Sequence, residues 1–269
     1  MFDWGAYLFG LGVVLTAATA TWVVSVAKRD VSIVDSLWGP LFAVAALAYA
    51  WPFAELAARG ALVLALVIVW ALRLAIYITA RNARAGEDYR YREIRRRNEP
   101  NFALKSLYLV FGLQAALAWL GSLPLLAAQR GGAPLGVLDA LGLALVIGGL
   151  ALETVADRQL KRFKQDPANR GRVLDRGLWR YSRHPNYFGE CCVWWGFGCL
   201  GLAAGGWWSL VSPLLMTWLL LRVSGVALLE QTIADRRPGY ADYVRRTSAF
   251  LPLPPRKPSA TRAGVDLEA

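Results

Sequence analysis

The chain has 269 residues, of which 56% are hydrophobic and 18% are charged, and its formal net charge is +11. A soluble domain carries about 25% charged residues, and the charges here crowd into short arginine-rich stretches, so a water-soluble fold is excluded. The pattern predicts an all-α, polytopic integral membrane protein in which polar loops join apolar helices. The sequence contains no nucleic-acid recognition module, so the positive charge does not indicate a nucleic-acid partner.

Seven apolar runs of about 20 residues predict seven transmembrane helices. The second run contains Gly39-Pro40 and is a candidate for a kink or a break, and the sixth follows Pro185 and is a candidate for a re-entrant or irregular helix. The fifth continues through Glu153 into Asp157, so we expect its end to leave the bilayer. In chain order the runs are Tyr7–Ala27, Leu37–Phe53, Ala61–Thr79, Leu104–Ala128, Val137–Ala156, Tyr187–Gly205 and Trp207–Leu229.

The distribution of Lys and Arg tests this count of helices. From the first loop to the carboxyl-terminal tail, successive polar segments carry 2, 1, 8, 1, 9, 0 and 7 of these residues. Because cytosolic loops are enriched in Lys and Arg, the alternation predicts an amino terminus outside and a carboxyl terminus in the cytosol. The amino-terminal MFDWG lacks the basic leader of a secretory signal, so we expect the first apolar run to be a retained helix.

The loops are too short for a second soluble domain, which predicts one seven-helix membrane domain over residues 1–255. The Pro-rich tail, residues 256–269, is expected to be disordered. Cys191, Cys192 and Cys199 lie in the sixth run without metal-ligand spacing, so we expect reduced packing residues and no bound metal. The net charge has two interpretations, namely orientation with attraction to anionic lipid head groups, or binding of an anionic ligand from the cytosol.

Ionisable residues at membrane depth are costly, at about 2.5–3.5 kcal/mol each, and therefore mark candidate functional positions. The alternative is that they lie at the membrane interface, extend toward water or pair with one another. The positions are Asp35, Arg73, Glu153, Asp157, Glu190, Arg222 and Glu230.

The stretch ALETVADRQLKRFK places two acids and two bases on one helical face. Glu153, Asp157, Lys161 and Lys164 follow one another at i, i+4, i+8 and i+11. One interpretation is an ordinary ladder of salt bridges. The other is a site in which the carboxylates bind sugar hydroxyls or a carboxamide and the ammonium groups bind phosphates.

The stretch RGLWRYSRHPNYFGE concentrates hydrogen-bonding groups at the predicted membrane edge. Pro185 permits a helix to begin there, and Glu190 follows Asn186 by four residues, on the same face. A lone His is more often structural than catalytic, but a helix does not require so many polar groups, so we predict that this segment binds a ligand. Its polar members are Arg180, Tyr181, Ser182, Arg183, His184, Asn186 and Tyr187.

The third loop, ARNARAGEDYRYREIRRRNEP, is dense in Arg and Tyr. One interpretation is an amphipathic surface helix on the membrane. The other is a ligand site, because residues 87–91 form a compact group of donors and acceptors near Arg81, and arginine fits phosphate by bidentate hydrogen bonding. The sequence has no Walker loop and no Gly-x-Gly-x-x-Gly after a strand. A dinucleotide would therefore have to bind between membrane helices.

Four stretches together resemble a known family. RGLWRYSRHPNYFGE resembles the signature of the steroid 5-alpha-reductase carboxyl-terminal superfamily. SIVDSLWG, GEDYRYRE and YADYVRRTSAFLPLPP are similar to its bacterial branch, once grouped as a domain of unknown function. The resemblance covers most of the chain, from Val31 to Pro254. His-Pro-Asn-Tyr also resembles the sterol C14 and C7 reductases, and a looser Arg-His-Pro-x-Tyr-x-Gly occurs in the isoprenylcysteine carboxyl methyltransferases.

This resemblance implies NADPH bound in a cytosol-facing cavity formed by the later helices, and a lipid-soluble enone that enters from the bilayer. By position, Asn186, Gly189 and Glu190 match the family directly, whereas Glu153 replaces a family Asn and Trp70 replaces a family Tyr. The predicted cofactor-binding residues are Arg73, Arg81, Arg84, Glu153, Asp157, Lys161, Lys164, Tyr181, Arg183, His184, Asn186, Tyr187 and Glu190. The predicted substrate-binding residues are Asp35, Trp38 and Trp70.

The implied reaction transfers a hydride to the beta carbon of a conjugated ketone, most concretely a 3-oxo-4-ene steroid. Negative charge then builds on the carbonyl oxygen, and a hydrogen-bond donor must stabilise that oxygen in a dry site. We predict that Asp35, kept neutral by burial, is this donor. Tyr89, Tyr91, Tyr187 or a water molecule is predicted to supply the alpha proton.

Two alternatives stay open. One is an S-adenosylmethionine-dependent methyltransferase of a membrane-bound thiol or lipid, which would use a nucleotide-containing cofactor near the same His-Pro turn. The other is a non-catalytic lipid-binding or transport protein, which would have no nucleotide affinity. The expected location is a bacterial cytoplasmic membrane, with membrane lipids as neighbours and the cofactor site facing the cytosol. The sequence leaves the oligomeric state open.

Overall fold

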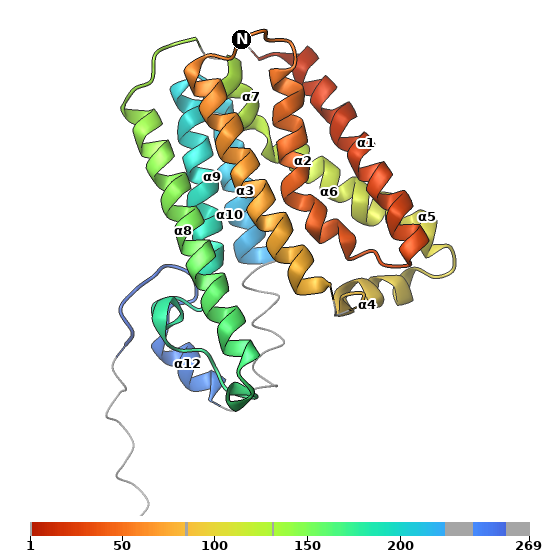
Figure 1. The fold of residues 1–269 in the computed structure, drawn as a ribbon, viewed down its shortest axis with the longest axis vertical. Helices are drawn as coiled ribbons and strands as arrows, with labels where there is room; N and C mark the ends of the chain where they lie inside the picture. Colours follow the sequence, from red (N-terminus) through yellow and green to blue (C-terminus); the bar gives the residue numbers. More distant parts are fainter. Residues whose placement is uncertain (1, 84–85, 131, 224–238, 257–269) are drawn as a thin grey trace, which may run out of the picture. The chain divides into compact units, whose positions relative to one another are not determined.

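A computed structural model describes residues 2–83, 86–130, 132–223 and 239–256. Within these residues the chain is helical and contains no β-strand, which confirms the all-α class (Figure 1). The chain divides into two compact units, which are treated separately below. The first unit is Met1–Val146 with Trp194–Met216, and the second is Ile147–Val193 with Thr217–Ala269.

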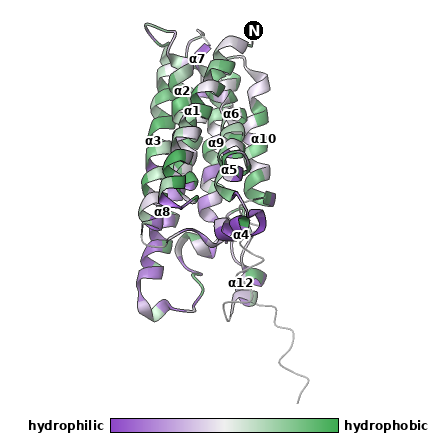
Figure 2. Cartoon of the chain, turned by 90° about the vertical axis from the view of Figure 1, so that its right-hand side faces the viewer, coloured by the Kyte–Doolittle hydropathy of each residue, from purple (hydrophilic) through white to green (hydrophobic). Residues whose placement is uncertain are grey.

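Five helices among the described residues are long and apolar enough to cross a membrane, as expected of a multi-pass membrane protein. Figure 2 shows apolar residues along these helices. Their exposed faces carry large apolar side chains such as Leu8, Val69 and Ile76, which suit contact with lipid. The five are α1 (Trp4–Lys28), α2 (Ile33–Ala50), α3 (Ala58–Asn82), the series Phe102–Arg130 and α8 (Val137–Gln165).

Helices also cover the sixth predicted run and the start of the seventh. The sixth corresponds to α9 (Pro185–Ala203). The seventh begins with η4 (Trp207–Leu210), α10 (Val211–Trp218) and the π-helical turn η5 (Leu219–Val223). Its predicted end at Leu229 lies outside the described residues. Seven spans and one domain over residues 1–255 therefore stay predictions.

Among the described residues, irregular helix lies in the fourth and seventh runs rather than in the second and sixth, where it was considered. Gly39-Pro40 does not break α2, whose helix continues through both residues, and α9 is a continuous helix. Pro40 removes one backbone hydrogen bond, but a Cβ at Gly39 would lie 3.0 Å from Ala71 Cα, so the glycine allows α2 to pack directly on α3.

Like the described part of the seventh run, the fourth predicted run is interrupted. It consists of α5 (Phe102–Ser106), the π-helical turn η1 (Leu107–Gly112), α6 (Leu113–Gly121) and α7 (Leu123–Arg130). Pro124 lies in the first turn of α7, where it cannot continue the hydrogen bonding of the helix before it. The apolar run by itself does not reveal this interruption.

Aromatic side chains form the centre of the first unit. Phe42 of α2 lies 4.5 Å from Trp194 of α9 and 5.6 Å from Trp70 of α3, measured between ring centroids. Trp70 and Trp194 meet edge to face at 5.3 Å, and Phe197 packs on Trp194. Each such pair contributes about 0.5–1.5 kcal/mol beyond its buried area, so this cluster holds α2, α3 and α9 together.

A buried ion pair joins the first turns of α3 and α8. Arg59 donates to both carboxylate oxygens of Asp139, at 2.7 and 2.9 Å, and its Nη2 also reaches the carbonyl of Pro134. Both residues are buried. Removal of one partner from such a pair leaves an uncompensated charge, which costs about 3–5 kcal/mol.

The second unit is built on a close contact between α8 and α9. A Cβ at Gly149 would lie 2.5 Å from the carbonyl oxygen of Gly189, and a Cβ at Gly189 would lie 2.9 Å from Cγ of Glu153. Small residues at these positions let the two backbones approach closely. The remaining described elements of this unit are η2 (Pro167–Asn169), η3 (Gly177–Arg180) and α12 (Tyr240–Arg246). As the helical spacing of Glu153, Asp157, Lys161 and Lys164 predicted, α8 continues past the apolar run to Gln165.

Candidate functional site

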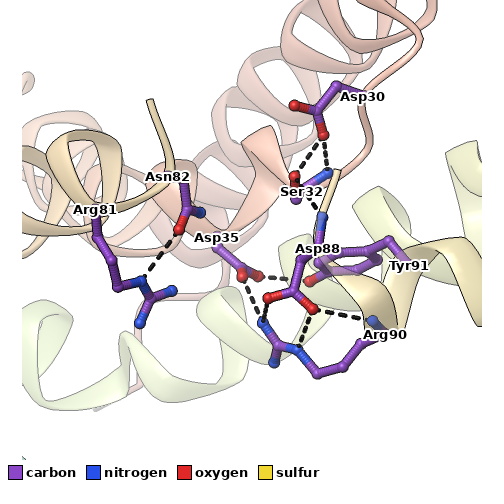
Figure 3. A network of polar contacts seen from close by, with 8 residues as sticks. All are labelled: Asp30, Ser32, Asp35, Arg81, Asn82, Asp88, Arg90 and Tyr91. Carbon is purple, nitrogen blue, oxygen red and sulfur yellow. Dashed lines mark hydrogen bonds and ion pairs between the residues drawn. The ribbon is translucent and has the colours of Figure 1, made fainter. Parts of the chain in front are cut away.

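The first cluster of candidate residues forms where the third loop binds the segment between α1 and α2 (Figure 3). Asp88 caps α4 (Tyr89–Asn98) by accepting from the backbone N–H of Arg90 at 2.9 Å. Glu87 accepts from the backbone N–H of Val31 at 3.0 Å and from Arg95 at 2.7 Å. GEDYRYRE and SIVDSLWG, which lie about 55 residues apart in the chain, are also bonded directly, because the backbone N–H of Asp88 donates to the Ser32 hydroxyl at 3.4 Å.

Asp35 is the centre of this cluster. Its Oδ1 accepts from the Tyr91 hydroxyl at 2.5 Å and its Oδ2 accepts from Arg90 Nη2 at 2.8 Å. Arg90 also binds the carboxylate of Asp88, at 3.0 and 3.2 Å. The Asp35 side chain is 14% exposed, so the group is close to the surface without being open to it.

These contacts change the expected division of roles between Asp35 and Tyr91. Asp35 accepts from both neighbours, which is the bonding of a carboxylate, whereas the prediction required a neutral acid that donates. Tyr91 is buried, and burial together with the negative charge of Asp35 raises the pKa of its phenol. Tyr91 therefore keeps its proton at physiological pH and is a neutral hydrogen-bond donor to Asp35, beside the charged donor Arg90.

The other described candidates of the first unit have further contacts. Tyr89 is 46% exposed, Trp38 packs its ring edge against Phe42 at 5.0 Å, and Arg81 binds the side chain of Asn82. Arg73 lies with its guanidinium 5.6 Å from the ring centroid of Tyr77. Arg84 lies outside the described residues.

Trp70 was predicted to bind substrate, but the structure places it elsewhere. It has no exposed surface and is part of the aromatic cluster with Phe42 and Trp194. Its bulky ring fills the space between α2, α3 and α9. The packing therefore gives Trp70 a role in the core rather than on a substrate surface.

The second cluster lies between α8 and α9, within the second unit. Glu153 and Asp157 project from successive turns of α8, and both are buried. Asn186, in the first turn of α9, donates its side-chain amide to Asp157 Oδ1 at 3.2 Å. Glu190 lies one turn further along α9 and is also buried. Three buried carboxylates and one amide therefore lie on facing turns of α8 and α9, and this group is a candidate site for a ligand with hydrogen-bond donors.

Lys161 and Lys164 continue the same helix beyond the buried acids, and both are exposed. The face of α8 thus changes from acidic and buried to basic and exposed, in the order that the spacing predicted. Beside it, His184 is buried and stacks on Tyr187 with ring centroids 5.5 Å apart. Tyr181 is 43% exposed.

The contacts of Arg183 were not foreseen. Its guanidinium donates to the carbonyl oxygens of Val244 and Thr247, at 3.1 and 2.6 Å, and its backbone N–H donates to Ser248. These carbonyls lie at the end of α12, where a cation is favourable. Arg183, predicted to bind cofactor, thus binds the carboxyl-terminal segment.

Further bonds join the same two stretches. Ser182 donates its hydroxyl to the carbonyl of Phe250 at 2.8 Å, and Leu253 donates its N–H to Tyr181 at 3.0 Å. Tyr243 donates to the carbonyl of Trp179. RGLWRYSRHPNY and YADYVRRTSAFLPLPP, two stretches that the resemblance singled out, are therefore bound to each other. Sequence reasoning missed Tyr243 and the end of α12, because polar pairing between distant stretches leaves no local pattern.

A family model described as protein of unknown function DUF1295 matches residues 21–247, a range that includes both clusters. The chain belongs to the DUF1295 family. This family lies in the steroid 5-alpha-reductase-like group. Among curated proteins, an uncharacterized protein of Schizosaccharomyces pombe is 28% identical over 276 residues, which covers 91% of this chain and 79% of the relative. No solved structure matches the chain.

Proposed function

We propose that this DUF1295 protein is an NADPH-dependent membrane reductase. Its reaction would saturate the conjugated C=C bond of a lipid-soluble enone, most concretely a 3-oxo-4-ene steroid. The observation that carries the proposal is the Tyr91–Asp35–Arg90 group, a buried phenol fixed by a carboxylate that is itself paired with a guanidinium. The family and the four stretches that resemble the reductases support it.

The chemistry assigned to Tyr91 follows from its contacts. When a carbonyl oxygen approaches, the phenol would move its hydrogen bond from Asp35 to that oxygen. Asp35 would remain paired through Arg90, at 2.8 Å, so the exchange would not leave a buried charge without a partner. A fixed donor aimed at the developing oxyanion is worth about 10²–10³ in kcat. Tyr187 or water would supply the alpha proton.

The second unit has the groups that a dinucleotide requires. Glu153, Asp157 and Glu190 are buried acceptors for ribose hydroxyls or the carboxamide, and Asn186 offers both an acceptor and a donor. Lys161 and Lys164, which are exposed along the same helix, would bind phosphates. When bound there, NADPH would supply the hydride for the reaction.

An open hollow provides a further basic surface in this unit. It has a volume of about 510 Å³ and its lining includes Arg170, Arg172 and Arg246, together with Asp175 and Asp242. The arginines there, like the two lysines, would favour the phosphate end of the cofactor over its uncharged parts. Arg183, in contrast, is assigned to the carboxyl-terminal segment.

The proposal includes the finer topology. Seven spans, with the amino terminus outside and the carboxyl terminus in the cytosol, are supported by the alternation of basic residues along the loops. The cofactor residues would then face the cytosol, where NADPH is available. The proposed location is the cytoplasmic membrane of a bacterium, within the bacterial branch of the reductases.

The first test measures cofactor binding to the purified chain in detergent. Binding is detected as a thermal shift with NADPH, NADH or S-adenosylmethionine. We expect NADPH to raise Tm most, with the shift lost in Asn186→Ala and Asp157→Ala. A ligand at 100 times its Kd stabilises by about 2.7 kcal/mol, which is measurable in this way.

The matched control for those variants is Thr154→Ala, a substitution on α8 whose hydroxyl donates only locally, to Leu150. This variant should keep the full NADPH shift. A shift with S-adenosylmethionine alone would replace the proposal with methyl transfer. If none of the three compounds shifted Tm, the result would favour a non-catalytic lipid-binding protein.

A further inference from the structure

Helix α4 has two faces with different partners. On the inner face, Arg90 and Tyr91 bind Asp35, and Arg95 binds Glu87. On the outer face, Arg96 and Arg97 are 77% and 74% exposed, and Arg92 is exposed beside them. The inner face fixes the helix to the first unit, so the outer arginines are held in place on a rigid support.

The position of α4 places this basic face at the end of the apolar helices. In Figure 1, α4 lies across the end at which α1 finishes and α2 begins. Arg95 reaches the carbonyl of Arg29, the residue that caps α1, at 3.5 Å. Figure 2 shows the change from apolar helices to hydrophilic α4 at this end. Helices of this length and hydropathy place their ends in the head-group region.

Exposed side chains next to α4 also indicate that this helix lies at the level of the lipid head groups. Leu104 of α5 and Tyr108 of η1, a few residues beyond α4, are 64% and 62% exposed. Apolar and tyrosine side chains are typical of the boundary between acyl chains and head groups. Exposed Lys28 and Arg29 at the end of α1 add two more positive charges beside α4.

One acid on α4 faces the outer arginines. Glu93 accepts from Arg96 at 2.8 Å and from Arg97 at 2.7 Å. These hydrogen bonds lower the pKa of Glu93 to about 2, so it stays ionised under physiological conditions. Each guanidinium has five N–H donors, and one carboxylate accepts only some of those that Arg96 and Arg97 carry. With Arg92, three positive charges oppose one negative charge.

We propose that the outer face of α4, formed by Arg92, Arg96 and Arg97, binds the phosphate groups of anionic phospholipids at this end of the membrane helices. Charge complementarity selects anionic over zwitterionic lipid, and arginine binds phosphate in a bidentate manner. A basic residue near an anionic surface gains about fivefold in membrane affinity. Tyr91, on the inner face of the same helix, is bonded to Asp35 of α2. Lipid binding to the outer face would hold α4 in place and would therefore also stabilise this bond.

This inference rests on the geometry of α4 and not on the proposed reductase activity, so its test uses no turnover. The full chain is placed in nanodiscs of phosphatidylcholine, or of phosphatidylcholine with about a third phosphatidylglycerol. Hydrogen exchange is measured for the peptide that covers α4. We expect phosphatidylglycerol to slow exchange there several-fold, and high salt to remove the effect because it screens exposed charges.

Variants separate the outer face from general charge effects. Arg92→Gln, Arg96→Gln and Arg97→Gln together should abolish the slowing by phosphatidylglycerol. A control with the same charge change, Arg170→Gln, Arg245→Gln and Arg256→Gln in the second unit, should retain it. The proposal is overturned if the α4 variant responds like the wild type. It is also overturned if glycerol phosphate in solution slows exchange of α4 as much as the lipid does.

Discussion

Tyr91 and Asp35 are the residues at which the proposed chemistry can be tested most directly. We expect Tyr91→Phe to lower kcat for enone reduction by about 10²–10³, because it removes the donor to the carbonyl oxygen, while Asp35 loses one hydrogen bond but stays paired with Arg90. The NADPH-induced thermal shift should be unchanged, because that shift depends on the residues of α8 and α9.

Tyr89→Phe is the matched control for this prediction. It removes the same hydroxyl from a neighbouring residue of α4 that is 46% exposed. Its kcat should stay within about twofold of the wild type, as for most changes of exposed residues away from a site. Equal losses in the two variants would argue against Tyr91 as the donor to the carbonyl oxygen.

The sequence predicted the members of the site better than their bonds. Asp35 and Tyr91 were both chosen in advance, and the structure brings them together. Asp35 was expected to donate a hydrogen bond, whereas in the structure it accepts from Tyr91 and Arg90. The sequence did not reveal this pairing, because it depends on the fold of a loop about 55 residues away. In the same way, the bonds of Arg183 to the end of α12 cannot be read from its neighbours in sequence.

Among the elements, the contact between α8 and α9 gives a prediction about stability. We expect Gly149→Ala to lower Tm in detergent by several degrees. Its new methyl would lie 2.5 Å from the Gly189 carbonyl and 2.8 Å from Val193 Cγ2, and overpacking of this kind costs about 1–3 kcal/mol. The measurement is thermal unfolding without cofactor.

The preceding glycine provides the control. A Cβ at Gly148 would have no heavy atom within 4 Å, and alanine favours a helix over glycine by about 1 kcal/mol. Gly148→Ala should therefore leave Tm unchanged or raise it. If the two substitutions lowered Tm equally, the packing explanation for Gly149 would be wrong.

Sequence periodicity and length predicted the elements well where the helix is long and apolar. The helices α1, α3 and α8 begin within a few residues of the predicted runs. The polar end of α8 was also predicted, because Glu153, Asp157, Lys161 and Lys164 follow helical spacing after the apolar run ends. The break considered at Gly39-Pro40 is absent, and α3 packs closely on α2 at that point.

For the whole molecule, the predicted orientation can be tested by labelling. In a chain that carries Cys191→Ala, Cys192→Ala and Cys199→Ala, one new cysteine is introduced as either Gly132→Cys or Arg170→Cys. The positive-inside pattern predicts that an impermeant thiol reagent added outside intact cells labels the first and not the second. If only Arg170→Cys were labelled, the orientation would be the opposite of the predicted one. The proposed cofactor residues would then face outside, and the proposal of a cytosolic cofactor would be wrong.

The pairing of the four family stretches has a consequence for recombination between relatives. The stretches around Asp35 and Asp88 bond to each other and both precede residue 99, whereas those around Arg183 and Tyr243 bond to each other and both follow residue 150. A hybrid that joins this chain to the fission yeast relative between residues 139 and 150 would inherit each of these pairs, and the Arg59–Asp139 pair, from one parent. The contacts between the two parental parts would then include the rings of Trp70 and Trp194, where apolar surfaces can repack more readily than mismatched hydrogen bonds can re-form.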